Sequence, residues 1–153
     1  MGQITIRELE KLDFFRGIPQ DVLQNLLNES TVASYKKKEV IFHSRTRTES
    51  VYFVLSGEVM LYNLTKHGNR KVIFILGKGR LLNQSIVSRK PNALFGEAAC
   101  PVQVLKVPET FFLRLMDQCH ELTYSVLREY ERNLWRMGHQ LKNTTGNMQT
   151  ERK

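Results

Sequence analysis

The sequence predicts an antiparallel β-roll of the jelly-roll type, mainly β with flanking α, followed by a long C-terminal helix. Three observations lead to this fold. Short runs of β-branched and aromatic residues alternate with turn residues between positions 31 and 107. Two short amphipathic segments precede these runs. A long segment after them repeats its apolar residues with a spacing typical of a helix that pairs with another helix.

The N-terminal region predicts two short helices, at residues 7–12 and 21–27. In both segments the apolar residues fall three and four positions apart, which places them on one helical face. Gly17 and Pro19 interrupt the pattern between them, so we expect two helices rather than one.

The central region predicts six strands. Ser56-Gly57 and the Lys66-His67-Gly68-Asn69 segment predict tight reversals between neighbouring strands, because glycine reaches positive φ without a steric penalty. The expected strands are residues 31–35, 40–42, 51–55, 59–64, 71–76 and 102–107.

The C-terminal region predicts a helix that starts at Glu109, after Pro108, and a longer one that starts near Glu121. In the longer helix the apolar residues form a stripe whose members alternate strictly three and four positions apart. This spacing is the pattern of a left-handed coiled coil, so we expect a parallel homodimer. The alternative is that the stripe packs on the β-roll of its own subunit. Polar neighbours such as Glu129 and Arg132 favour the dimer. The stripe comprises Leu127, Tyr130, Leu134, Met137 and Leu141, and Thr144 and Met148 continue its register.

Composition excludes several classes of protein. The net charge of +8 comes from dispersed Lys and Arg residues, so a solvated basic surface is favoured over a nucleic-acid interface. No apolar run is long enough for a membrane helix and no signal segment is present, so we expect a cytoplasmic protein without a membrane partner. Cys100 and Cys119 form no CxxC motif, and a disulfide or a redox role for either of them stays open.

Several stretches occur in an order that resembles one known family. They are the opening segment 12–19, the segment 35–42, and above all residues 51–60 with Ser56-Gly57-Glu58. In this order the chain resembles the cyclic-nucleotide-binding-like sensor domain of the Crp/Fnr family of transcription regulators. The resemblance implies a β-roll with N-terminal helices at 1–108 and C-terminal helices, including the dimerisation helix, at 109–148.

The resemblance also implies an N-terminal fragment. Residues 143–147 look like the family's hinge, and 149–153 like the start of an absent winged helix-turn-helix domain. DNA would then be bound only through that missing C-terminal domain.

In family members that bind cyclic AMP, a short cassette supplies a glutamate for the ribose and an arginine for the phosphate. Phe95-Gly96-Glu97-Ala98 looks like its start but lies too close to the final strand, so the cassette is placed at residues 79–85. Asn83 and Gln84 then stand where the glycine and the glutamate would be. Arg89 is the nearby cation, although it could equally be a solvated loop residue.

We therefore expect a small-molecule effector other than cyclic AMP, bound between the β-roll and the long helix. The expected pocket residues are Leu82, Asn83, Gln84, Ser85, Arg89 and Tyr130. Apolar walls with one cation and a few amides suit a small organic anion.

The leading hypothesis is an effector-sensing and dimerisation domain of a transcription regulator. The alternative is a cyclic-nucleotide-binding regulatory module of a kinase, channel or transporter. No catalytic constellation and no HxH-type metal spacing occurs, so we expect neither an enzyme nor a metal site. Some members of the family that the chain resembles use haem, but no two histidines are placed as axial ligands, so no cofactor is expected.

Overall fold

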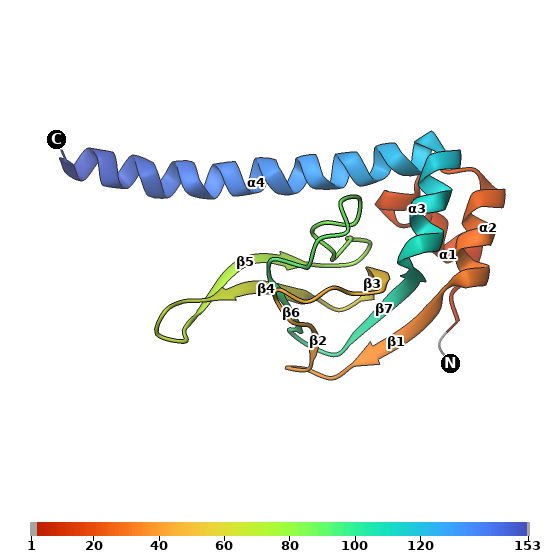
Figure 1. Ribbon diagram of the computed structural model, residues 1–153, viewed down its shortest axis with the longest axis horizontal. Helices are drawn as coiled ribbons and strands as arrows, with labels where there is room; N and C mark the ends of the chain where they lie inside the picture. Colours follow the sequence, from red (N-terminus) through yellow and green to blue (C-terminus); the bar gives the residue numbers. More distant parts are fainter. Residues whose placement is uncertain (1–2, 153) are drawn as a thin grey trace.

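The computed structural model describes the backbone of residues 3–152 and the side chains of residues 3–142. Two antiparallel sheets form the roll, with strand orders β1-β7-β3 and β2-β6-β4-β5. Helices cover one end of the roll and the last helix runs across it (Figure 1). The elements are α1 (Ile6–Glu10), η1 (Asp13–Phe15), α2 (Gln20–Glu29), β1 (Thr31–Tyr35), β2 (Val40–Phe42), β3 (Ser50–Ser56), β4 (Val59–Leu64), β5 (Arg70–Leu76), β6 (Phe95–Ala98), β7 (Val102–Pro108), α3 (Glu109–Gln118) and α4 (His120–Arg152).

The predicted fold class is confirmed, and the six predicted strands are present within one residue at each end. The sequence missed β6, which pairs with both β2 and β4. Because Phe95–Ala98 is a strand, it is not the cassette, as its position near the final strand had indicated. Its Glu97 is buried and accepts hydrogen bonds from the Tyr62 hydroxyl (3.1 Å) and from Arg70 Nη1 (2.8 Å).

Two apolar cores lie on opposite faces of the three-stranded sheet. Because side chains alternate along a strand, Phe53 of β3 points toward the helices while Tyr52 and Val54 point into the roll. The core on the helical side joins α1, η1, α2, α3 and the first turns of α4 to the sheet. The core inside the roll fills the space between the two sheets and includes Phe42 and Leu82.

Two glycines allow close approaches that the roll requires. Gly57, in the β3–β4 turn, has φ of +84°, and a Cβ atom there would lie 2.4 Å from the Pro101 carbonyl oxygen. A Cβ atom on Gly96 would lie 2.7 Å from the Phe42 ring. Glycine at 96 therefore lets the end of the Phe42 ring approach the backbone of β6 closely.

Helix α4 extends beyond the body of the protein, in the same direction as the β4–β5 hairpin (Figure 1). It is helical from His120 to Arg152, so the hinge expected at 143–147 does not interrupt it. The side chains of Thr144 and Met148 lie outside the described residues. Within the described part of the chain, no helix is both long and apolar enough to cross a membrane.

Candidate functional site

The segment between β5 and β6, residues 77–94, lies between the roll and α4 (Figure 1). Gly79, at φ of +84°, turns the chain back onto β3. Its backbone N–H donates to the Val54 carbonyl (2.7 Å), and that of Leu82 donates to the Tyr52 carbonyl (2.9 Å). Residues 79–82 are therefore held to the three-stranded sheet through β3, which fixes the segment against the roll.

A buried ion pair joins this segment to α4. Arg80 Nε donates to Glu129 Oε2 at 2.6 Å, and Arg80 Nη2 donates to Asn133 Oδ1 at 2.6 Å. Glu129 Oε2 also accepts the backbone N–H of Leu81 at 3.2 Å. The sequence places Glu129 among the polar neighbours of the apolar stripe, and the structure buries this residue, which is only 5% exposed. Such pairs hold their partners firmly, because separating them leaves a buried charge uncompensated.

Asn83 and Tyr130 form a second link between the segment and α4. The Tyr130 hydroxyl donates to the Asn83 carbonyl oxygen (2.7 Å). Burial raises the pKa of Tyr130, which extends into the alkaline range the pH at which its phenol stays protonated and able to donate. The Asn83 side chain accepts from the Tyr52 N–H (2.8 Å) and donates to the Thr48 hydroxyl and the Ser50 carbonyl.

The Gln84 side chain joins the early part of the segment to its last residue, Leu94. Its Nε2 donates to the Leu82 carbonyl (2.8 Å), and its Oε1 accepts the Leu94 N–H (3.0 Å). Leu82 belongs to the core inside the roll, and Ser85 is half-buried. The structure thus places Leu82, Asn83 and Gln84 beneath α4, and Tyr130 of that helix contacts Asn83.

Arg89 lies elsewhere, at the start of α3. It has φ of +58° and pairs with the buried Glu109 (3.3 Å), which also pairs with Arg47 (2.9 Å). Among the described cavities, Arg89 contributes to one of about 350 Å³ that these residues share. No described cavity is lined by the other predicted pocket residues, so an effector-binding role for this set stays a prediction.

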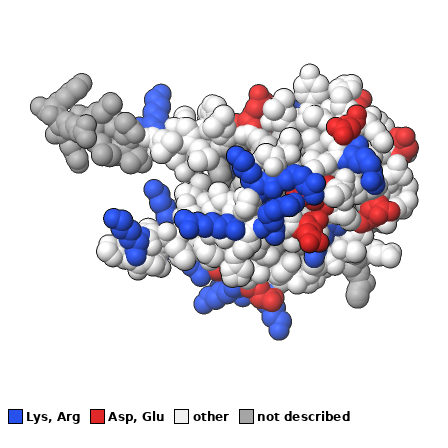
Figure 2. All heavy atoms as spheres, viewed as in Figure 1, with Lys and Arg blue, Asp and Glu red and all other residues white. Residues whose placement is uncertain are grey.

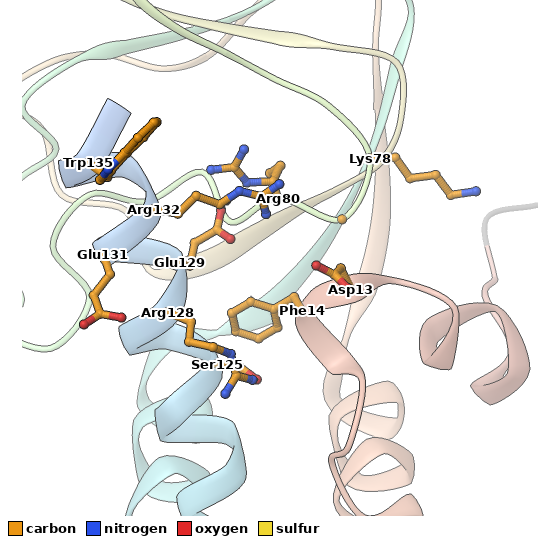
Figure 3. Close-up of a pocket in the computed structure, with 11 residues that line it drawn as sticks. Asp13, Phe14, Lys78, Arg80, Ser125, Arg128, Glu129, Glu131, Arg132 and Trp135 are labelled. Atoms are coloured by element: carbon orange, nitrogen blue, oxygen red, sulfur yellow. Dashed lines mark hydrogen bonds and ion pairs between the residues drawn. The ribbon is translucent and has the colours of Figure 1, made fainter. Parts of the chain in front are cut away.

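The largest described cavity, about 510 Å³, lies between α4, η1 and the 78–80 turn (Figure 3). We call it the flank cavity. Sequence reasoning missed this cavity, because its walls come from three segments far apart in the chain. Its lining residues are Asp13, Phe14, Lys78, Gly79, Arg80, Ser125, Arg128, Glu129, Glu131, Arg132 and Trp135.

Another flank of α4 carries the stripe that the sequence predicts as a dimer seam. Leu127, Leu134 and Leu141 are 52%, 71% and 63% exposed, and Met137 is 40% exposed. Tyr130 differs from them: it is half-buried and turned toward Asn83. The four other residues are exposed rather than packed on the roll of their own subunit, and we call them the seam.

Other groups of functional interest are few in the part of the chain that the structure describes. No cluster of three His, Cys, Asp or Glu side chains is placed to hold a metal ion there. Cys100 and Cys119 are both free, and burial raises the pKa of the Cys119 thiol. On the face shown in Figure 2, Lys and Arg gather over the β4–β5 hairpin and the segment beside it, while Asp and Glu lie mainly toward the helical end.

Known proteins agree with this architecture. Residues 32–119 match the model of the cyclic nucleotide-binding domain family. The sensor domain of the transcriptional regulator DNR from Pseudomonas aeruginosa is similar, with a TM-score of 0.71 and 22% identity over 84% of this chain and 87% of that one. The catabolite activator protein of Thermus thermophilus has a TM-score of 0.73 and 19% identity over 86% of this chain and 62% of that one.

A regulatory protein from Silicibacter pomeroyi DSS-3 is also similar, with a TM-score of 0.68 and 22% identity over 90% of this chain. The chain spans 64% of that protein's length. No curated protein matches the sequence. At these identities the structural likenesses show the fold. The family match, which covers more than half of the chain, shows that it belongs to the cyclic nucleotide-binding domain family, with the fold of a Crp/Fnr-type sensor domain.

Proposed function

We propose that this chain is the effector-sensing and dimerising domain of a transcription regulator of the Crp/Fnr type, with a regulatory rather than an enzymatic role. One observation carries the proposal. Residues 80–83, which lie within the 79–85 segment where the sequence predicts the cassette, make four hydrogen bonds to Glu129, Tyr130 and Asn133 of α4. The same helix presents an apolar seam to its surroundings. A change in the segment therefore acts directly on the helix that would join two subunits.

The coupling follows from how the segment is held. Leu82 contacts the core inside the roll, while its neighbours on either side, Leu81 and Asn83, are bonded to α4. An effector that enters the roll displaces Leu82 and must shift or break some of these bonds. Its differential affinity for the two arrangements would then set the position of α4.

The polar groups of the segment favour an effector other than a cyclic nucleotide. The side-chain amides of Asn83 and Gln84 are engaged with the chain itself. The two nearby arginines, Arg80 and Arg89, are paired with Glu129 and Glu109. A cyclic phosphate would have to remove a cation from one of these carboxylates to offset its own desolvation. A small, largely apolar molecule can enter without breaking either pair.

Dimerisation is the second part of the proposal. Leu127, Leu134 and Leu141 recur every seven residues and are exposed, so a parallel copy of α4 would bury them against the same residues of its partner. For this chain we propose that DNA is contacted through a further domain and not through the roll.

Calorimetry with cyclic AMP and cyclic GMP separates this proposal from its alternative, a cyclic-nucleotide-binding module of another regulatory protein. The family match alone leaves that alternative open. We expect neither nucleotide to bind at micromolar concentration. Native mass spectrometry of protein purified from its natural host should instead show an adduct that Leu82→Trp abolishes by filling the roll. Tight nucleotide binding would refute the effector class, and a monomer would refute the dimer.

A further inference from the structure

The flank cavity has a position and a chemistry that the proposed sensing role does not use. Successive residues of a helix advance by about 100°, so Arg132 lies roughly 160° around α4 from Leu134 of the seam. A second copy packed on the seam would therefore leave the flank cavity open to solvent. Its volume of about 510 Å³ lies in the range of small-molecule sites.

The charges that line the cavity leave one positive charge in excess. Lys78 and Glu131 extend away from the other lining side chains (Figure 3). The remaining charged groups are three arginines, Arg80, Arg128 and Arg132, against two carboxylates, Asp13 and Glu129. Glu129 is already bonded to Arg80, and Asp13 pairs with Arg16 at 3.3 Å.

Arg128 and Arg132 make no ion pair with any described residue, although they lie one helical turn apart on the same flank. Like charges four residues apart on a helix repel each other. An oxyanion bound at this pair would relieve that repulsion and form charge-assisted hydrogen bonds with a guanidinium group.

An exposed aromatic ring, that of Trp135, lines the same cavity as Arg128 and Arg132. Trp135, the single tryptophan of the chain, lies one turn beyond Arg132 and is 66% exposed. It stacks on His139, with ring centroids 4.5 Å apart and an interplanar angle of 20°. An exposed indole next to a guanidinium offers a flat apolar surface for a planar ring and a cation for its charged substituent.

We propose that the flank cavity binds a small aromatic monocarboxylate, with the carboxylate at Arg132 and the ring against Trp135. A monoanion neutralises the excess charge of the lining. A phosphate dianion would leave net negative charge beside Glu129 and Asp13, which disfavours it. Because Arg80 and Glu129 also line the cavity, such a ligand touches the ion pair that joins the roll segment to α4. A ligand in the flank cavity would thus act on the position of α4 from a site separate from the inside of the roll.

The test uses benzoate and follows the indole N–H resonance of Trp135, which is unique in the chain. We expect a saturable shift with benzoate, none with benzyl alcohol, which lacks the charge, and weaker binding of cyclohexanecarboxylate and inorganic phosphate. Arg132→Gln should weaken benzoate binding about tenfold, the effect of losing one hydrogen bond to a charged group.

Arg136→Gln is the matched control. It removes the same charge from the same helix, but Arg136 lies over the Phe74 ring (5.7 Å) and does not line the cavity. Benzoate affinity should change less than twofold in this variant. Three results would overturn the proposal: a non-saturable shift, equal weakening in both variants, or phosphate binding as tightly as benzoate. Both variants change exposed or half-exposed side chains, and unchanged thermal unfolding would verify their folding.

Discussion

Helix α4 has one flank that faces the roll and another that faces away from it, and the two differ in chemistry although they belong to the same turns of the helix. The flank toward the roll is held by polar contacts of specific geometry, centred on Glu129, Tyr130 and Asn133. The seam flank carries aliphatic side chains that are more than half exposed at Leu127, Leu134 and Leu141. Polar contacts define one arrangement of the helix on the roll, whereas the apolar side chains would supply non-directional attraction to the proposed second copy.

This difference separates two tasks within one element. Hydrogen-bonded ion pairs break over short displacements, so the roll flank responds to small movements of residues 80–83. An aliphatic seam tolerates small sliding and rotation, so it can hold two subunits together while their relative orientation changes. Single substitutions can therefore disturb one flank at a time.

The largest effect is expected at the seam, from Leu134→Arg. The proposed dimer would lose two leucines from its seam and gain two facing charges, so its dissociation constant should rise about a thousandfold or more. Light scattering over a dilution series measures the change. His139→Arg adds the same charge on a different flank and should leave the dimer intact. A Leu134→Arg protein that stayed dimeric would show that the seam is not the dimer interface.

Glu129→Gln disturbs the roll flank and should lower the free energy of unfolding by about 3 kcal/mol, because Arg80 remains buried without its counter-charge. Urea unfolding followed by circular dichroism measures the loss. Glu131→Gln, on an exposed neighbour, should cost less than about 0.5 kcal/mol. Replacing both partners together, as Arg80→Met with Glu129→Leu, should recover most of the stability. Equal costs for the two glutamates would mean that the ion pair does not anchor α4.

Tyr130→Phe removes the hydroxyl that donates to the Asn83 carbonyl and should cost about 1 kcal/mol. Tyr124→Phe, on an exposed tyrosine of the same helix, is its control. The same unfolding assay applies. If the two substitutions cost the same, the link between Asn83 and α4 contributes nothing measurable.

Alkaline pH tests the same link with the smallest expected effect. Burial raises the pKa of Tyr130 in the folded protein, whereas an unfolded tyrosine ionises near pH 10. The stabilisation is therefore complete below about pH 10 and decreases as the pH rises above it. Burial also raises the pKa values of Tyr35, Tyr52 and Tyr62. The wild type and Tyr130→Phe should therefore both lose stability at alkaline pH, and the variant should lose it less steeply. Parallel urea midpoints between about pH 9 and pH 11 would contradict this.

Local sequence signals were sufficient for most of the fold. Strand residues such as those of β1 and β4 alternate or are rich in β-branched side chains, and turn residues bound them, so their ends could be placed closely. β6 could not be recognised in this way, because Gly96 and Glu97 are poor strand formers. They are accommodated by tertiary contacts: the Phe42 ring over Gly96, and Tyr62 and Arg70 at Glu97.

The site was less accessible to sequence reasoning. The apolar spacing of α4 identified Leu127, Leu134 and Leu141 as one stripe, since it depends only on positions within the helix. The Arg80–Glu129 pair joins residues 49 positions apart, and nothing in either neighbourhood marks a partner. Nearness in sequence predicts that Arg89 lies with Asn83 and Gln84, but the loop places it beside Glu109 instead.

The most direct test of the account is a disulfide across the proposed seam. In a background without Cys100 and Cys119, Leu134→Cys places a thiol at a position that would face itself in a parallel pair, whereas His139→Cys places one off the seam. Mild oxidation should give a covalent dimer through residue 134 and little through 139. Cross-linking that is absent at 134, or equally efficient at 139, would contradict the claim that α4 joins the roll segment to a second subunit.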